Sequence, residues 1–241
     1  MKMKKNNLTT RLLLGIALLG IAIGSTHAGD AIDSLKKPAK TTGSVKVTAK
    51  SMNLGTFGYV LNPNPTLEYV GSISHGNNYA FADIDTKLKT GEPYGLLMGA
   101  GRTFERGKLS GLVEAELFSV KGFDTWLEGF GTVAYDLGRG FSANATVSMA
   151  AREPAGIFTG AGLSYSKQIG KWSFGIQNLT GRMTGNYFGV EDSLGANTTK
   201  ATATYQFRKN MSAFGTVHHN QPLTKQLEQN TAIEAGFKVV F

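Results

Sequence analysis

The sequence predicts an all-β fold, an antiparallel up-and-down transmembrane β-barrel of twelve strands. The first observation is a series of runs, about ten residues each, in which apolar and polar side chains alternate. In 141–149, for example, Phe141 and Val147 share one face while Ser142 and Ser148 share the other. The second observation is that every second connection between these runs is short. The third is that no window of the mature chain shows a sustained 3.6-residue apolar period, so no long helix is expected there.

The predicted strands follow one another along most of the chain. They cover 54–61, 66–75, 78–89, 94–104, 108–120, 124–137, 141–151, 156–168, 171–182, 198–207, 211–219 and 231–241. Most are near the ~10 residues that cross a bilayer at the tilt of a barrel strand. Ten strands remain an alternative, in which the first two runs do not span the membrane.

The connections give an independent test of the strand count. Five short ones follow alternate strands, at 75–78, 105–107, 138–140, 169–171 and 208–210. Successive strands run in opposite directions, so these five lie at one end of the barrel, which we expect to be the periplasmic end. The two longest connections, 183–197 and 220–230, then lie at the outer end. Aromatic residues near the short turns are predicted to form a girdle at the membrane interface: Tyr135, Phe141, Trp172, Tyr205, Phe207 and Phe241.

The N-terminus is typical of an export signal. A basic start, an apolar run over 12–23 and the small-residue pattern of Thr26-His27-Ala28 predict a signal peptide over 1–28. The apolar run is too short for a good transmembrane helix. Residues 29–52 are polar and rich in lysine, and are predicted to form a periplasmic N-terminal segment. Within it, Val45, Val47 and Ala49 alternate with Lys46, Thr48 and Lys50, so a strand could begin there. The barrel is then predicted over 53–241.

The last residues carry a second targeting pattern. Phe237, Val239 and Phe241 share one face of the final predicted strand, and Gly236 lies on the other face. With Gly236 three residues before Val239 and five before Phe241, this stretch resembles the C-terminal assembly signal of bacterial outer-membrane β-barrels. The resemblance is porin-like in pattern and assigns no subfamily. It implies a place in the bacterial outer membrane, contact with outer-membrane lipid and lipopolysaccharide, and recognition by periplasmic chaperones and the barrel-assembly machinery.

The charge balance argues against a nucleic-acid partner. The chain has 25 Lys and Arg against 17 Asp and Glu, a net charge of +8. Four of the basic residues lie in the predicted signal peptide and five more lie in 29–52. The rest of the chain is nearly neutral, so the excess charge belongs to the N-terminus and not to the surface of the fold. The chain has no cysteine, which excludes disulfides, a lipid anchor on cysteine and thiol chemistry.

Strict alternation predicts which charged residues face the barrel interior. They are the acidic residues Glu68, Asp83, Asp85, Glu114, Glu116 and Glu128, and the basic residues Lys200, Arg208 and Lys238. An inward position is favoured because Lys or Arg facing lipid at mid-membrane costs roughly 2–4 kcal/mol. The two sets are predicted to lie on opposite walls and to set a transverse field across a wet channel. The alternative is that they pair and fill a closed interior, which Phe118, Trp126 and Phe130 would narrow further.

The chain carries no strong catalytic motif. It has no phosphate-binding glycine loop and no His-Glu-x-x-His pattern. His218 and His219 lie near the outer end of one predicted strand, where barrel enzymes of the phospholipase, omptin and palmitoyltransferase families place histidine. The local sequences of those families are absent, and neighbours on a strand face opposite sides, so the pair cannot chelate one metal from one face. No catalytic residue, metal or cofactor is therefore expected, and the protein is predicted not to be an enzyme.

The function that these patterns favour is passive diffusion of small hydrophilic solutes across the outer membrane. Two alternatives stay open. One is a barrel enzyme with a site at the extracellular rim that uses His218 or His219. The other is a non-conducting barrel whose loops 183–197 and 220–230 bind a ligand or partner.

Overall fold

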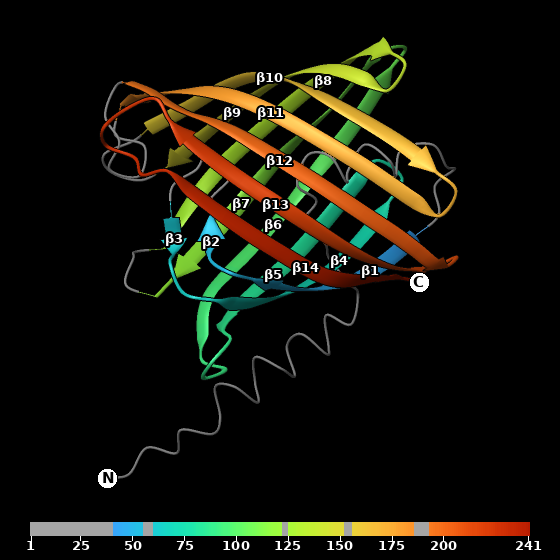
Figure 1. Ribbon diagram of the computed structural model, residues 1–241, viewed down its shortest axis with the longest axis horizontal. Coiled ribbons are helices and arrows are strands. Elements are labelled where there is room, and N and C mark those ends of the chain that lie inside the picture. Colours follow the sequence, from blue (N-terminus) through green and yellow to red (C-terminus); the bar gives the residue numbers. More distant parts are fainter. Residues whose placement is uncertain (1–40, 55–59, 122–124, 152–155, 186–192) are drawn as a thin grey trace.

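The barrel is closed and consists of antiparallel strands (Figure 1). The computed structural model describes residues 41–54, 60–121, 125–151, 156–185 and 193–241. Within them the twelve barrel strands are β1 (Thr41–Lys50), β4 (Thr66–His75), β5 (Asn78–Lys87), β6 (Pro93–Arg106), β7 (Leu109–Val120), β8 (Trp126–Gly138), β9 (Phe141–Ala151), β10 (Gly156–Ile169), β11 (Trp172–Gly185), β12 (Ser193–Arg208), β13 (Met211–Pro222) and β14 (Asn230–Val240). A separate two-stranded sheet pairs β2 (Asn53–Leu54) with β3 (Val60–Asn62). The prediction of a twelve-stranded antiparallel barrel is confirmed.

The first barrel strand differs from the prediction. It is β1, which lies inside the segment 29–52 that was predicted to be periplasmic. Of the predicted first strand at 54–61, residues 54, 60 and 61 belong to the two-stranded sheet and not to the barrel, and residues 55–59 lie outside the described residues. β1 pairs with β14 on one side and β4 on the other, and so closes the barrel. The predicted signal peptide 1–28 lies outside the described residues and stays a prediction.

Two-residue turns join the strands at one end of the barrel, which we call the short-turn end. Gly107 and Gly170 each begin such a turn with a positive φ, of 64° and 60°. Glycine in this position matches the II′ turn, whose twist suits an antiparallel hairpin. The C-terminus lies at the same end, where Phe241 exchanges two backbone hydrogen bonds with Gly43 of β1. The longer connections lie at the opposite, long-loop end.

The outer face of the barrel is apolar. Val113, Leu163, Ile233 and Phe237 are each more than half exposed there. Aromatic side chains gather at the short-turn end of this face: the rings of Trp172 and Tyr205 lie 4.9 Å apart, and those of Phe141 and Tyr165 lie 4.7 Å apart. An apolar band bordered by aromatic residues is how a barrel strand meets lipid. Among the described residues, no helix is long and apolar enough to cross a membrane.

Candidate solute path in the barrel interior

A cluster of charged side chains lies on the inner wall of β1, β4 and β5. The β1–β4 register sets Thr48 opposite Glu68, so that Lys46 and Lys50 flank the glutamate diagonally. Lys46 Nζ lies 3.0 Å from Glu68 Oε2, and Lys50 Nζ lies 2.5 Å from Glu68 Oε1. Lys50 Nζ also lies 3.9 Å from Asp85 Oδ1. Glu68 is therefore held between two ammonium groups.

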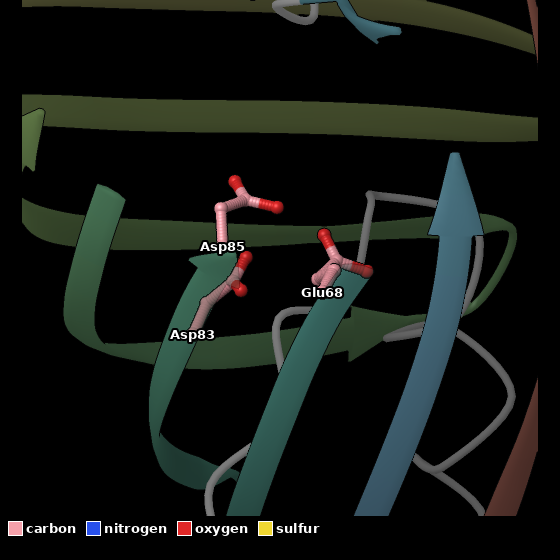
Figure 2. A group of neighbouring side chains, drawn as sticks. All are labelled: Glu68, Asp83 and Asp85. Atoms are coloured by element: carbon pink, nitrogen blue, oxygen red, sulfur yellow. The ribbon is translucent and has the colours of Figure 1, made fainter. Parts of the chain in front are cut away.

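Three carboxylates converge in this cluster. Figure 2 shows Glu68 on β4 and Asp83 and Asp85 on β5 with their carboxylates turned toward one another. One oxygen of each lies within 4.8 Å of the others, a spacing that would allow a metal ion. The Lys50 ammonium already contacts two of the three carboxylates, so it supplies the positive charge that a metal ion would otherwise supply. By formal count the cluster holds three carboxyl groups against two ammonium groups, so one carboxyl group has no lysine to balance it.

A second acidic group lies on the neighbouring wall, on β7 and β8. The Tyr79 hydroxyl donates a hydrogen bond to Glu114, and the Ser148 hydroxyl donates one to Glu128. Glu116 is the register partner of Glu128 on the facing strand. The six carboxylates that alternation assigned to the interior therefore all lie on one continuous arc of the inner wall, from β4 to β8.

The interior at the long-loop end of β7–β11 is apolar. Its buried members are Val120, Trp126, Ala150, Phe158, Leu179 and Met183, with Tyr94, Phe118, Phe130 and Leu227 packed against them. The rings of Phe118 and Trp126 stack with centroids 5.0 Å apart and planes 2° apart. The inward aromatic residues expected to narrow a pore thus form one packed group.

The connection between β1 and β4 is tied to this same end of the interior. The Asn53 amide donates a hydrogen bond of 2.6 Å to Asp85 Oδ2, and the Tyr94 hydroxyl donates one to the Leu61 carbonyl oxygen. Asn53 and Asn62, one from each strand of the small β2–β3 sheet, are buried. The small sheet is therefore anchored at the long-loop end of the barrel.

The interior near the short-turn end is hollow and polar. A cavity of about 440 Å³ lies there. Its lining combines serine and threonine hydroxyls, asparagine and glutamine amides, apolar and aromatic residues such as Phe214 and Tyr165, and four charged groups: Lys46, Lys200, Glu234 and Lys238. The hydroxyls bond to one another across strands, as in the Ser142–Ser164 pair at 2.7 Å and the Thr202–Thr216 pair at 3.0 Å. Such a wall offers many donors and acceptors to a polar solute. Lys46 is paired with Glu68, so the charges that remain in the hollow are those of Lys200 and Lys238 against Glu234.

The three predicted inward basic residues fall into two places. Lys200 and Lys238 line the hollow. Arg208 is exposed at a turn of the short-turn end, because the register shifts between Gln206 and Arg208 and sets Arg208 opposite Met211. A bulge adds one residue to one strand and so breaks the alternation on which the placement rested. The role of the remaining residues in a solute path stays a prediction.

The two histidines face opposite sides of β13. His218 is buried in the interior, whereas His219 Nδ1 is 2.8 Å from the Thr231 hydroxyl in an exposed outward pair. A shared metal site on this pair is therefore ruled out by the strand geometry, as the sequence indicated. The alternation of Val45, Val47 and Ala49 with polar neighbours indicated that a strand could begin there. Sequence reasoning did not assign that strand to the barrel, and so it missed Lys46 and Lys50 as interior residues.

No family profile matches this chain and no curated protein matches it. Solved structures do match. The KdgM porin is 10% identical with a TM-score of 0.59, covering 82% of this chain and 99% of that one. The NanC porin is 9% identical with a TM-score of 0.53, covering 82% and 98%. The COG4313 outer membrane channel of Pseudomonas putida F1 is also 9% identical with a TM-score of 0.53, covering 90% and 100%.

The fold is that of the outer-membrane porins. At this level of identity the likeness concerns the course of the chain and says nothing of individual residues. The KdgM porin has also been solved in complex with disordered oligogalacturonate. The three structures compared above are two porins and one outer membrane channel.

Proposed function

We propose that the protein is a passive channel for small hydrophilic solutes in the bacterial outer membrane. The observation that carries the proposal is the pairing of an apolar outer face with a polar hollow of about 440 Å³ inside a closed barrel. A barrel with a filled interior needs packed side chains there, and not a hollow whose wall carries hydrogen-bonded hydroxyl groups. The short-turn end is then periplasmic, and the mature chain begins near Gly29 after export.

The charged groups inside the barrel assign roles within that function. Glu114, Glu116 and Glu128 line the narrower part of the path, and Lys200 and Lys238 line the wide part. With Lys46 paired to Glu68, Lys200 and Lys238 still outnumber Glu234 in the hollow. This favours anionic solutes there, because fixed positive charge in a confined space concentrates counter-ions. An acidic sugar of the kind bound by the KdgM porin would meet both the lysines and the hydroxyls.

Conductance in a planar bilayer tests the proposal. Purified folded protein should produce stepwise currents, and a salt gradient should give a reversal potential that reports anion preference. The double variant Lys200→Gln with Lys238→Gln should move that potential toward cations, with the folded state checked by the heat-dependent gel shift of barrels. A folded protein that carries no current would overturn the channel and leave the surface-loop binding function in its place. An unchanged potential in the variant would remove the two lysines from the path.

A further inference from the structure

Two arginines lie on the outer face of the barrel, where β6 approaches the short-turn end. They are Arg102 and Arg106, and we call them the arginine pair. Both are exposed, and both share the outward face of β6 with Met98, which is 41% exposed. The register between β6 and β7 is continuous from Gly95 to Arg106, so no bulge changes the alternation. The arginine pair therefore faces outward from the wall and not into the barrel interior.

The strand register places the arginine pair at the border of the apolar outer face. Arg102 is level with the β4–β5 turn, because its register partner is Asn78, the first residue of β5. The next outward residues toward the long-loop end are Ala80 and Ala100, which are register partners of each other. Polar side chains thus give way to apolar ones at the level of Arg102. Arg106, the last residue of β6, lies four positions beyond it on the polar side.

The outer face at the short-turn end carries basic side chains and, among the described residues, no acidic one. Besides the arginine pair, Lys167 of β10 faces outward and is exposed. The acidic residues of this end, Glu105 and Asp136, lie on the inward side: Glu105 alternates with the arginines, and Asp136 is opposite Ser142 of the hollow. The ion pairs between described residues lie elsewhere in the barrel, so no described carboxylate neutralises either arginine.

The surface between the two arginines is open on the side of β5. The residue between them on the outward face is Phe104, whose register partner on β7 is Gly111. A Cβ on Gly111 would overlap the Phe104 ring, so the ring lies over that glycine and leans toward β7. The Cα atoms of the arginine pair are about 13 Å apart along the strand, a span that two arginine side chains can bridge to one phosphate group. The exposed Asn78 amide beside Arg102 adds a further hydrogen-bond donor.

We propose that the arginine pair binds the phosphate group of an anionic phospholipid in the membrane leaflet at the short-turn end. The inference rests on the membrane-embedded barrel of the proposed function but not on its conducting. Guanidinium groups bind phosphate through paired, charge-assisted hydrogen bonds. The level of the site favours a lipid over a soluble anion, because acyl chains below the phosphate would cover Ala80 and Ala100. The basic outer face favours an anionic headgroup over a zwitterionic one.

Lipid binding in detergent tests the site on the unaltered chain. Folded protein in non-ionic detergent would be titrated with phosphatidylglycerol and, separately, with phosphatidylcholine, and bound lipid would be counted by native mass spectrometry. Phosphatidylglycerol should bind more tightly, its binding should weaken as salt rises, and inorganic phosphate at equal concentration should not displace it. Equal binding of the two lipids would overturn the proposal. Displacement by inorganic phosphate would overturn the assignment to a lipid.

Two charge-matched double variants locate the site. Arg102→Gln with Arg106→Gln should bind phosphatidylglycerol about thirtyfold more weakly, as expected for the loss of two basic residues at an anionic membrane surface. Lys171→Gln with Lys209→Gln removes the same charge from exposed positions at two other short turns, and should bind the lipid as the wild type does. An equal loss in both variants, or no loss in the arginine variant, would contradict the site. The arginine variant should keep the heat-dependent gel shift of a folded barrel and should still conduct in a phosphatidylcholine bilayer, so failure of this proposal and failure of the channel are distinguishable.

Discussion

Glu68 and Lys50 form the shortest ion pair among the described residues, at 2.5 Å between Oε1 and Nζ inside the barrel wall. The pair joins β1 to β4, and Lys46 binds the other carboxylate oxygen of the same glutamate. Because both ammonium groups depend on Glu68, its removal would leave two buried cations with much weaker compensation.

The cluster predicts opposite effects for two similar substitutions. Glu68→Gln should lower the free energy of unfolding by about 3–5 kcal/mol, as expected for breaking a buried pair from one side. Asp83→Asn should leave that free energy unchanged or raise it, because it removes one carboxyl group from a cluster that has more carboxyl groups than lysines, and Asp83 Oδ1 is buried with no hydrogen bond among the described residues. Urea unfolding in detergent measures both. Equal losses in the two variants would mean that Asp83 also takes part in the charge balance.

Neutralising the two carboxylates of β7 should change the ion selectivity of the channel while the barrel stays folded. Glu114→Gln with Glu116→Gln should move the reversal potential toward anions at low salt. The shift should shrink as salt rises, since screening over about 10 Å at 0.1 M weakens a field across a water-filled path. Val113→Arg with Leu117→Arg on the lipid face of the same strand should instead prevent folding. An unchanged potential in the folded Gln variant would remove both carboxylates from the path.

Gly236 lies where β14 pairs with β1 to close the barrel, and the space there does not admit a side chain. A Cβ at this position would lie 2.2 Å from the Val47 carbonyl oxygen of β1, a backbone atom that cannot move aside. Gly236→Ala should therefore impair closure even when urea-unfolded chain refolds into detergent without any cellular factor. Gly215→Ala is the matched control, because its nearest contact would be 3.9 Å away. Normal refolding of Gly236→Ala would leave only a recognition role for this glycine.

Deletion of Phe241 is expected to have the opposite effect to Gly236→Ala: it should impair assembly in cells but not refolding in detergent. Phe241 is 67% exposed on the outer face, so its deletion removes little side-chain packing, although the two backbone hydrogen bonds with Gly43 are lost. If Gly236, Val239 and Phe241 are an assembly signal, the truncated chain should be degraded in the periplasm of cells yet refold in detergent. Loss of the heat-dependent gel shift from cells, with the shift retained after refolding in vitro, is the expected pair of results. Normal yield from cells would show that assembly does not depend on this residue.

The barrel could be predicted from the sequence because its two strongest constraints are local. Alternation along each strand decides which side chains meet lipid, and the short turns fix the parity of the strands. Eleven of the predicted runs overlap barrel strands, and the six inward carboxylates follow from alternation alone. Neither inference needs a contact between residues far apart in the sequence.

The errors arose where the structure depends on contacts that a single strand does not show. β1 was left outside the barrel because its segment is polar and rich in lysine, although its alternation allowed a strand. The burial of Lys46 and Lys50 is made acceptable by Glu68 on the next barrel strand, a contact that the sequence does not show. Arg208 was assigned inward because a bulge leaves no mark in a polar run.

Of the two tryptophans of this chain, one lies inside the barrel and the other lies on its outer face. Trp126 is 3% exposed and stacks on Phe118 inside the barrel, whereas Trp172 is 46% exposed on the aromatic border of the outer face. The fluorescence of Trp126 therefore reports on the barrel interior, and that of Trp172 reports on the outer face. Brominated acyl chains should quench Trp172 alone, and a solute that enters from the long-loop end should change the emission of Trp126 alone. With either tryptophan replaced by phenylalanine, one optical signal would follow insertion into lipid and the other would follow occupancy of the interior.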